Sequence, residues 1–337
     1  MSLQKIPKAD ECGYESRPEG LSTTLFSEKL LGWYDQHKRD LPWRADRDPY
    51  RVWLSEIMLQ QTRVAAVIEH YRRFLAKFPT IHKLAAAREA SVLAVWSGLG
   101  YYRRARMLHA AAKYLVKECG GTFPQTSADL RALPGIGRYT AAAIASIAFD
   151  EPVAVVDGNV ERVVNRVHGR RLSGEELWRV AEKWIDRERP GDFNQAMMEL
   201  GATVCVPRAP QCLLCPVRPL CATRGELKDV VTAPAQKRRE IHFGLARRGN
   251  NVFLVQRSKE HSLMPGMWEL PEYSNGSTHK KRLFSVRHSI TVTDYQVRVI
   301  ALEDPGSIAG RWITASRLPS LPLTGLARKI LKRVELI

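Results

Sequence analysis

The sequence predicts a mostly α-helical domain followed by a small α+β domain, and two observations support this prediction. Up to about residue 225, apolar residues recur at three- and four-residue steps, with almost no two-residue alternation. After a polar stretch at 226–237, short alternating pieces typical of strands replace that spacing. We therefore expect a helical domain over 22–225, a linker over 226–237 and a second domain over 238–337.

Within the first domain, helical spacing begins near Leu25, and the run 50–78 reads as a helical pattern with an apolar residue at nearly every turn. Glycine and proline residues punctuate the later helices. These helices are expected at 82–97, 103–119, 127–132, 138–149, 159–168 and 175–188.

The second domain contains four strand-like pieces, IHFGLAR, NVFLVQR, YQVRVIAL and GRWITA. It closes with a helical pattern, TGLARKILKRV. Strands followed by a terminal helix indicate a small α+β fold.

The chain is strongly basic, with 52 Lys and Arg residues against 35 Asp and Glu and a net charge of +17. Such a charge indicates an acidic polymer as partner, above all nucleic acid; a basic protein without such a partner is the alternative. The sequence contains neither an apolar run of about 18 residues nor a secretory signal. We expect an intracellular monomer, in the bacterial cytoplasm and associated with the nucleoid, that does not bind membranes.

Four of the six cysteines lie within seventeen residues: Cys205, Cys212, Cys215 and Cys221 are separated by six, two and five residues. Thiolates this close together can hold one inorganic centre. Iron–sulfur clusters take four thiolates in short, uneven loops. Zinc sites usually show two close pairs, whereas only the middle pair is close here. The spacing favours a cluster, with a structural zinc site or separate buried thiols as the alternatives.

A glycine-rich turn, LPGIG, lies between two predicted helices. Gly135 and Gly137 allow backbone conformations that are closed to other residues. The turn, which begins at Leu133, exposes amide groups beside the N-terminus of a helix that starts near Tyr139. Such groups bind anions, and with this charge the anion is expected to be a DNA phosphate. An ordinary helix–helix turn is the alternative.

These motifs together resemble a known family. The LPGIG turn, the aspartate in VDGNV and the pattern C-x6-C-x2-C-x5-C look like the helix–hairpin–helix endonuclease III superfamily. Within it, LPWR (41–44), SEIMLQQTRV (55–64), GLGYYRRAR (98–106) and VDGNVERV (156–163) look like MutY-type adenine DNA glycosylases. The resemblance implies a helical core that holds a [4Fe–4S] cluster. It also implies that the protein acts on duplex DNA and removes adenine mispaired with 8-oxoguanine or guanine.

Cleavage of a bond between adenine and its sugar needs a proton donor for the base and an anion beside the sugar cation. Glu56 lies in a strongly apolar helix, and burial keeps a carboxyl protonated; a surface glutamate is the alternative. Asp157 suits the N-cap of the helix beginning near Val160. The resemblance implies that Glu56 protonates the adenine and that Asp157 stabilises the sugar cation, with Asn159 orienting Asp157 or a water molecule.

Position 139 distinguishes branches of the superfamily. Bifunctional members have a lysine there that forms a Schiff base, whereas this chain has Tyr139, and a phenol cannot form an imine. The resemblance thus implies a monofunctional glycosylase in which Tyr139 hydrogen-bonds near Asp157. It further implies that Gln61 and Tyr101 fill the gap left by the extruded adenine, and that Arg44 contacts that base or its phosphate.

The second domain resembles the Nudix fold at MPGMWELP (264–271), but the glutamate cluster that binds Mg²⁺ in Nudix hydrolases does not follow. It is therefore interpreted as a binding module rather than a hydrolase, and the resemblance implies that this module contacts 8-oxoguanine. A Phe-Ser-His loop often senses that base in the family, and the matching place here reads His288-Ser289-Ile290. Only Ser289 fits, so it is the candidate contact; an alternative match at 284–286 also lacks the histidine.

Two rival functions remain open. A related glycosylase could act on thymine or uracil mispairs, although such enzymes usually lack the Nudix-like domain. A non-enzymatic iron–sulfur protein would bind DNA without releasing any base.

Overall fold

The computed structural model describes residues 22–227 and 237–337, apart from 259, 262, 274–281 and 291–292. Most of the predicted linker therefore lies outside the described residues. The chain divides into two compact units. One comprises Met1–Lys38, Val156–Arg187 and Gln195–Leu227, and the other Arg39–Val155, Glu188–Asn194 and Lys228–Ile337. Among the described residues, no helix combines the length and the apolar character needed to cross a membrane.

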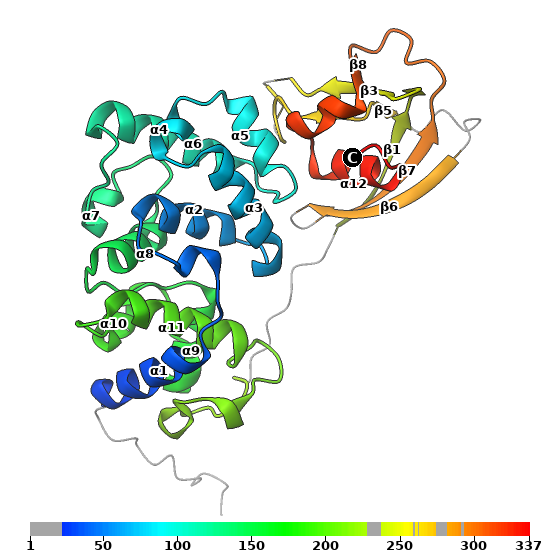
Figure 1. The fold of residues 1–337 in the computed structure, drawn as a ribbon. Coiled ribbons are helices and arrows are strands. Elements are labelled where there is room, and N and C mark those ends of the chain that lie inside the picture. Colours follow the sequence, from blue (N-terminus) through cyan, green and yellow to red (C-terminus); the bar gives the residue numbers. More distant parts are fainter. Residues whose placement is uncertain (1–21, 228–236, 259, 262, 274–281, 291–292) are drawn as a thin grey trace, which may run out of the picture. The chain divides into compact units, whose positions relative to one another are not determined.

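The first unit is helical and ends in the cysteine-rich segment (Figure 1). Ser22 caps its first helix by accepting a hydrogen bond from the Leu25 amide at 3.3 Å. The rings of Phe26 and Trp184 lie 4.7 Å apart, joining that helix to α10. Its elements are α1 (Thr23–His37), α9 (Gly158–His168), α10 (Gly174–Trp184), most of α11 (Pro190–Thr203), η2 (Cys212–Leu214) and η3 (Arg218–Leu220).

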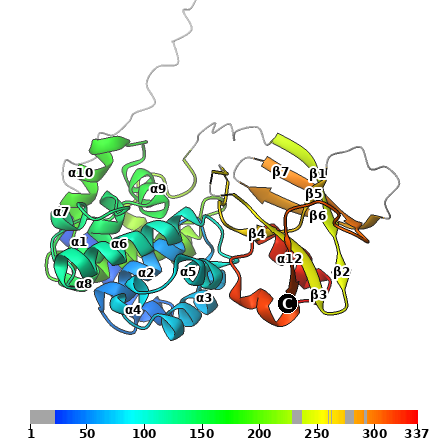
Figure 2. The same cartoon turned by 90° about the horizontal axis from the view of Figure 1, so that it is seen from above.

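The helical part of the second unit is built around α2, in which the residues from Val52 to Met58 are all buried. A helix that is buried all round needs neighbours on every side, and α3, α6 and α8 contact it (Figure 2). The elements of this part are η1 (Pro42–Arg44), α2 (Pro49–Leu59), α3 (Val64–Lys77), α4 (Ile81–Ala85), α5 (Glu89–Trp96), α6 (Arg103–Cys119), α7 (Ser127–Leu130) and α8 (Arg138–Phe149).

The predicted helices at 103–119 and 138–149 are confirmed as α6 and α8. A continuous helix over 50–78 is wrong, because residues 60–63 form a turn in which Gln61 has a φ of 55°. The pattern over 82–97 likewise splits into α4 and α5. In both cases the apolar spacing continues across the break, so it hides the turn. The sequence analysis also did not predict α11.

The C-terminal part of the second unit is an α+β fold, as predicted. The strands are β1 (Lys237–Leu245), β2 (Arg247–Arg248), β3 (Asn251–Gln256), β4 (Trp268–Glu269), β5 (Glu272–Tyr273), β6 (Arg282–Ile290), β7 (Thr293–Ala301) and β8 (Arg311–Thr314). One sheet has the order β5-β1-β7-β6, and the other has the order β2-β3-β4 with β8 paired to β3. Strands β1 and β7 are parallel, and β6 and β7 are antiparallel. The 3₁₀ helix η4 (Ala315–Ser320) leads to α12 (Gly325–Arg333).

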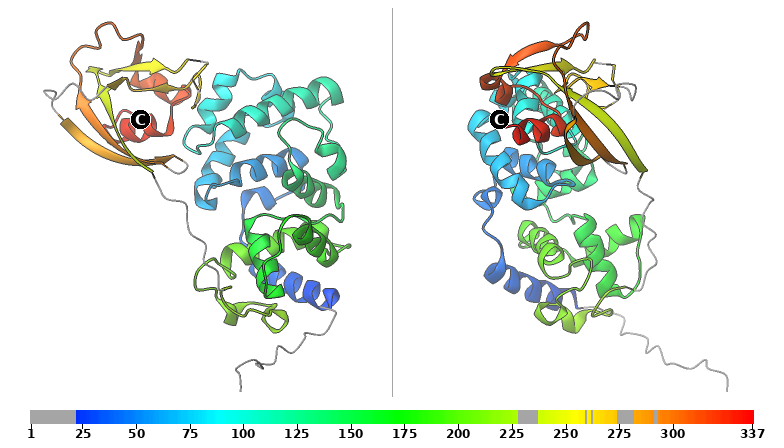
Figure 3. Two further views of the ribbon diagram at one scale, coloured as in Figure 1. Left: turned by 180° about the vertical axis from the view of Figure 1, so that it is seen from behind. Right: turned by 90° about the vertical axis from the view of Figure 1, so that its right-hand side faces the viewer.

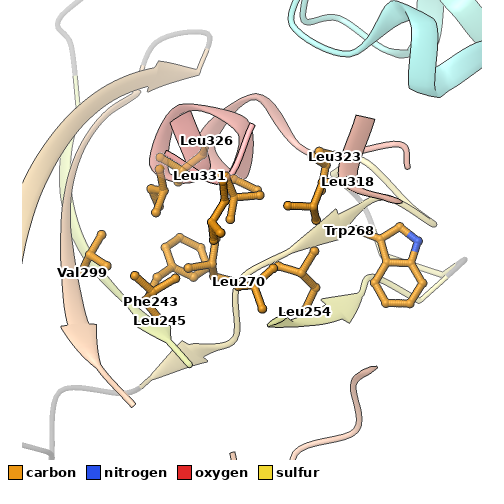
Figure 4. Packing of buried hydrophobic residues seen from close by; sticks show 14 of the residues in the cluster. Phe243, Leu245, Leu254, Trp268, Leu270, Val299, Leu318, Leu323, Leu326 and Leu331 are labelled. Atoms are coloured by element: carbon orange, nitrogen blue, oxygen red, sulfur yellow. The ribbon is translucent and has the colours of Figure 1, made fainter. Parts of the chain in front are cut away.

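Helix α12 covers the long strands of the first sheet (Figures 1 and 3). Its Leu326 and Leu331 belong to one buried cluster with Phe243 of β1, Leu254 of β3 and Val299 of β7 (Figure 4). One apolar cluster therefore joins both sheets to the terminal helix. Strand β6, which carries Ser289, comes last in the strand order of the first sheet.

Candidate functional site

Glu56 lies near the end of α2 and is only 5% exposed. The helix begins at Pro49, a residue suited to the first helical turn, and the Asp48 carboxylate caps it by accepting from the Arg51 amide at 3.0 Å. The Tyr139 hydroxyl donates a hydrogen bond to Glu56 Oε2 at 2.6 Å. Residues 83 positions apart are thus joined by a direct contact in a buried setting.

The glycine-rich turn leads into α8, which carries Tyr139. Gly135 has a φ of +75°, and a Cβ atom on it would lie 2.8 Å from the Met107 Cβ, so glycine is required there. The expectation for Gly137 is wrong: its φ of −88° suits any residue, and a Cβ atom added to it would meet nothing within 4 Å. The Leu133 side chain is buried, which leaves only the backbone of that residue for a ligand.

Asp157 is the N-cap of α9, as predicted, and the helix begins at Gly158. The Asp157 Oδ1 accepts hydrogen bonds from the backbone amides of Asn159 at 2.9 Å and Val160 at 2.8 Å. Its Oδ2 accepts from the Asn159 side-chain amide at 2.9 Å. Both carboxylate oxygens therefore accept hydrogen bonds, and one of the donors is the Asn159 side chain. Tyr139 and Asp157 belong to different units, so the hydrogen bond expected near Asp157 stays a prediction.

Arg162, which sequence reasoning missed, supports Asn159 from one helical turn away. Its Nη2 donates to Asn159 Oδ1 at 2.8 Å and to the Gly201 carbonyl at 2.7 Å, and its Nε donates to the Cys205 carbonyl at 2.7 Å. Burial lowers the pKa of the Arg162 guanidinium. A Cβ on Gly201 would lie 2.6 Å from the Asn159 Cβ, so α11 approaches α9 closely there. Only the three-residue spacing from Asn159 hinted at this arginine.

Gln61 and Tyr101 are exposed residues in two turns of the second unit. Gln61 follows α2, Tyr101 precedes α6, and both have a positive φ, of 55° and 46°. Tyr101 is 47% exposed, unusual for so large an apolar side chain. Arg44 is half-buried, and its Nη1 donates to the Arg39 carbonyl at 3.1 Å.

The four predicted cysteine ligands line one cavity in the first unit together with Arg166. The Arg166 Nη1 donates to the Cys205 Sγ at 3.3 Å. Burial raises the pKa of the Cys205 thiol and raises that of Cys215 to about 12. Thiols in such a setting lose their protons when a metal centre supplies positive charge.

The same four cysteines can be compared with the ligand sets of zinc sites and of iron–sulfur clusters. Four sulfurs around one tetrahedral zinc lie within about 4 Å of one another. Within the described part of the chain, no group of three or more His, Cys, Asp or Glu side chains is arranged to hold a single metal ion. Four cysteine thiols around a shared cavity are the ligand set that an iron–sulfur cluster takes.

Ser289 lies near the end of β6, opposite Asp294 of β7, and its hydroxyl donates to the Asp294 carboxylate. Burial lowers the pKa of the adjacent His288. These residues belong to an open depression on the sheet. It is lined by Arg238, Arg239, Glu240, Arg287, His288, Ser289, Asp294, Tyr295 and Gln296.

The chain is similar to known DNA repair proteins. Residues 54–187 match the HhH-GPD superfamily of base excision DNA repair proteins. The adenine DNA glycosylase of Mus musculus is 47% identical over 251 residues, covering 68% of this chain and 49% of that protein. The adenine DNA glycosylase of Buchnera aphidicola subsp. Acyrthosiphon pisum is 34% identical over 267 residues, covering 74% of this chain and 75% of that protein.

Among solved structures, that of a thermostable thymine-DNA glycosylase matches with a TM-score of 0.57 and 31% identity. It covers 60% of this chain and 96% of that one. The chain spans about half the length of the mouse protein. Relatives come from eukaryotes and bacteria alike, so they do not support the expected bacterial source in particular.

Proposed function

Because the chain belongs to the adenine DNA glycosylase family within the HhH-GPD superfamily of base excision DNA repair proteins, we propose that it is an enzyme that excises adenine from duplex DNA. Its target is adenine mispaired with 8-oxoguanine or guanine. The observation that carries this proposal is the buried Glu56 carboxyl, held by the Tyr139 hydroxyl at the start of α8. The net charge of +17 suits a nucleic-acid substrate.

Glu56 acts as the general acid. Its proton goes to N7 of adenine as the bond between N9 and the sugar C1′ breaks, and N9 keeps the bonding electrons, so the base leaves neutral. The Tyr139 hydroxyl holds one oxygen of this buried carboxyl in place, which orients the acid for proton transfer. The proton lost by the attacking water restores the acid.

Asp157 supplies the negative charge that stabilises the sugar cation. Three N–H donors fix its two oxygens, so the charge is positioned before the reaction begins. Asn159 provides two of these donors. Tyr139 stands where bifunctional members carry lysine, and without an amine no Schiff base forms. The enzyme is therefore monofunctional and leaves the DNA strand uncut.

Extrusion of the adenine depends on side chains that replace it in the stack. Gln61 and Tyr101 take this role because both are exposed residues in turns. Arg44 contacts the extruded base or its phosphate. The amides of the turn from Gly135 to Gly137 bind a phosphate of the same strand, at the N-terminus of α8.

The four cysteines hold a [4Fe–4S] cluster, which stabilises the C-terminal part of the first unit. Purified protein should contain about four iron and four sulfide per chain, with visible absorbance. Cys215→Ser should remove both, whereas Cys119→Ser, which changes a cysteine of α6, should not. One zinc per chain and no sulfide would identify the alternative centre.

The C-terminal domain reads the base opposite the adenine. Ser289 and the basic residues of its depression contact the 8-oxoguanine nucleotide, with Arg238 and Arg287 supplying positive charge. A Ser289→Ala variant should then lose preference for 8-oxoguanine over guanine without losing adenine release itself.

Base release from defined duplexes tests the function. One duplex carries adenine opposite 8-oxoguanine, and the others carry A:G, A:T, T:G and U:G. Free adenine from the first duplex, with alkali needed to cut the strand, supports both the specificity and the role of Tyr139. Release of thymine would instead assign the chain the activity named for its thymine-DNA glycosylase neighbour, and release of uracil would indicate a related mismatch glycosylase. Binding without any release would favour a DNA-binding protein.

A further inference from the structure

Arg104, the second residue of α6, contacts two turns that are far apart in the sequence. One turn, residues 60–63, follows α2 and contains Gln61. The other, residues 97–102, precedes α6 and contains Tyr101. The side chain of this one arginine therefore meets both segments whose tips carry the proposed gap-filling residues.

The contacts with the first turn begin at the end of α2. The Arg104 Nη1 donates to the carbonyl oxygens of Ile57 at 2.7 Å and Met58 at 3.0 Å, and also to that of Gln60. These carbonyls lie at a helix end, where they have no partner within the helix. The Nη2 donates to Thr62 Oγ1 at 3.1 Å, so the contacts surround Gln61 on both sides.

The Arg104 guanidinium also contacts the second turn. The Arg104 Nη2 donates to the Gly100 carbonyl at 3.3 Å and approaches the Leu99 carbonyl at 3.5 Å. The guanidinium carbon lies 5.4 Å from the ring centroid of Tyr101 and 5.4 Å from that of the buried Trp96. The Trp96 indole also donates to the Gly100 carbonyl, at 3.1 Å.

Both turns need such support because their key residues adopt an unfavourable backbone. Gln61 and Tyr101 have φ values of 55° and 46°, in a region that non-glycine residues rarely occupy. A residue stays there only when its surroundings determine it strongly. Burial lowers the pKa of Arg104 to about 10, so the guanidinium remains charged at neutral pH. Its planar fork reaches several carbonyls at once, which a lysine cannot do.

We propose that Arg104 is a positioning residue for base extrusion. It fixes the turns at 60–63 and 97–102 relative to each other, so that Gln61 and Tyr101 enter the DNA stack together. The inference rests on the proposed function, because it assigns Arg104 to the extrusion step of that reaction. Arg104 itself need not touch the DNA.

The test compares Arg104→Lys with Arg103→Lys, an exposed neighbour on the same helix. Both variants keep the positive charge and lose a guanidinium group, but only Arg104→Lys removes the one that contacts the two turns. Single-turnover adenine release is measured at saturating protein on the A:8-oxoguanine duplex. Base unstacking is followed in a Glu56→Gln background by the fluorescence of a 2-aminopurine next to the target adenine. Duplex affinity and melting temperature are recorded for each variant.

Arg104→Lys should lose most of the fluorescence gain and slow adenine release by about tenfold to 100-fold, while Arg103→Lys keeps both. A full fluorescence gain in Arg104→Lys would overturn the proposal, whatever happens to release, affinity or melting temperature. Equal losses in both variants would also overturn it, because the effect would then be one of surface charge.

A second variant covers the case in which Arg104→Lys fails to fold. Thr62→Val removes a single acceptor of Arg104 and should reduce the fluorescence gain in the same direction, by less. An unchanged gain in Thr62→Val would then overturn the proposal. If the wild-type protein unstacks the base but releases no adenine, the proposed function fails while the same comparison still decides the role of Arg104. If it unstacks no base, the inference is wrong.

Discussion

Glu56 in the second unit and Asp157 in the first are both carboxylic acids, yet their surroundings differ. Glu56 lies within a helix that is buried on all sides, and it accepts a hydrogen bond from the neutral phenol of Tyr139. Asp157 is half-buried at the start of a helix, where three N–H donors meet its oxygens and the helix dipole favours negative charge. The first setting suits an acid that gives up a proton, and the second suits a fixed anion.

The two proposed roles therefore rest on local structure rather than on residue type. If this contrast is correct, the donors around Asp157 should matter more than the donor to Glu56, because hydrogen bonds to a charged acceptor are worth more than those between neutral groups. Substitutions at each carboxyl and at its hydrogen-bond donors test the contrast one interaction at a time.

Glu56→Gln should have the largest effect. The amide keeps the shape and can still meet Tyr139, but it has no proton to give, so adenine release should fall by about 10³-fold to 10⁴-fold. Single-turnover kinetics on the A:8-oxoguanine duplex measure this. Duplex affinity should stay the same, and Glu69→Gln on the exposed side of α3 is the matched control. Equal losses of binding and release would remove Glu56 from the chemistry.

Asp157→Asn should follow, with a fall in release of about 10²-fold to 10³-fold. The substitution removes the anion, but asparagine is also a good N-cap, so α9 should persist and the melting temperature should change little. Asp129→Asn, at an exposed position in α7, serves as control. A large fall in melting temperature with unchanged single-turnover release would mean that Asp157 is only a cap.

Asn159→Ala removes the side-chain donor to Asp157 while the two backbone donors remain. One hydrogen bond to a carboxylate contributes about 1.5–3 kcal/mol, so release should slow by roughly tenfold to 100-fold. Glu161→Ala, an exposed change in the first turn of α9, should leave the rate unchanged. A rate for Asn159→Ala equal to that of the wild type would contradict a positioned anion.

Much of the fold could be predicted from the sequence because its signals are local. The glycines that end α6 and the N-cap Asp157 act within a few residues of themselves. The turn at Gln61 could not be predicted, since the groups that hold it come from Arg104, more than forty residues away. Apolar spacing on both sides of that turn is the same, so the sequence shows no break.

Some residues of the candidate site could be predicted from the sequence, and others could not. Asp157, Asn159 and the four cysteines could be singled out from short motifs, and the contact between Asp157 and Asn159 lies within its motif. Arg104 and Arg162 could not, because an arginine that binds carbonyl oxygens has no characteristic spacing in a basic chain. Only the structure shows which of the many cations point inward.

Tyr139→Phe should have the smallest effect, and it tests the contrast between the two carboxyls most directly. The change removes one hydrogen bond between neutral partners, worth about 1 kcal/mol, so release should slow by roughly fivefold. Tyr114→Phe, at an exposed tyrosine of α6, is the control for loss of a hydroxyl. A larger loss for Tyr139→Phe than for Asn159→Ala would reverse the expected order. It would mean that Glu56 carries negative charge when it meets the phenol, and that the carboxylate at this position acts as the anion.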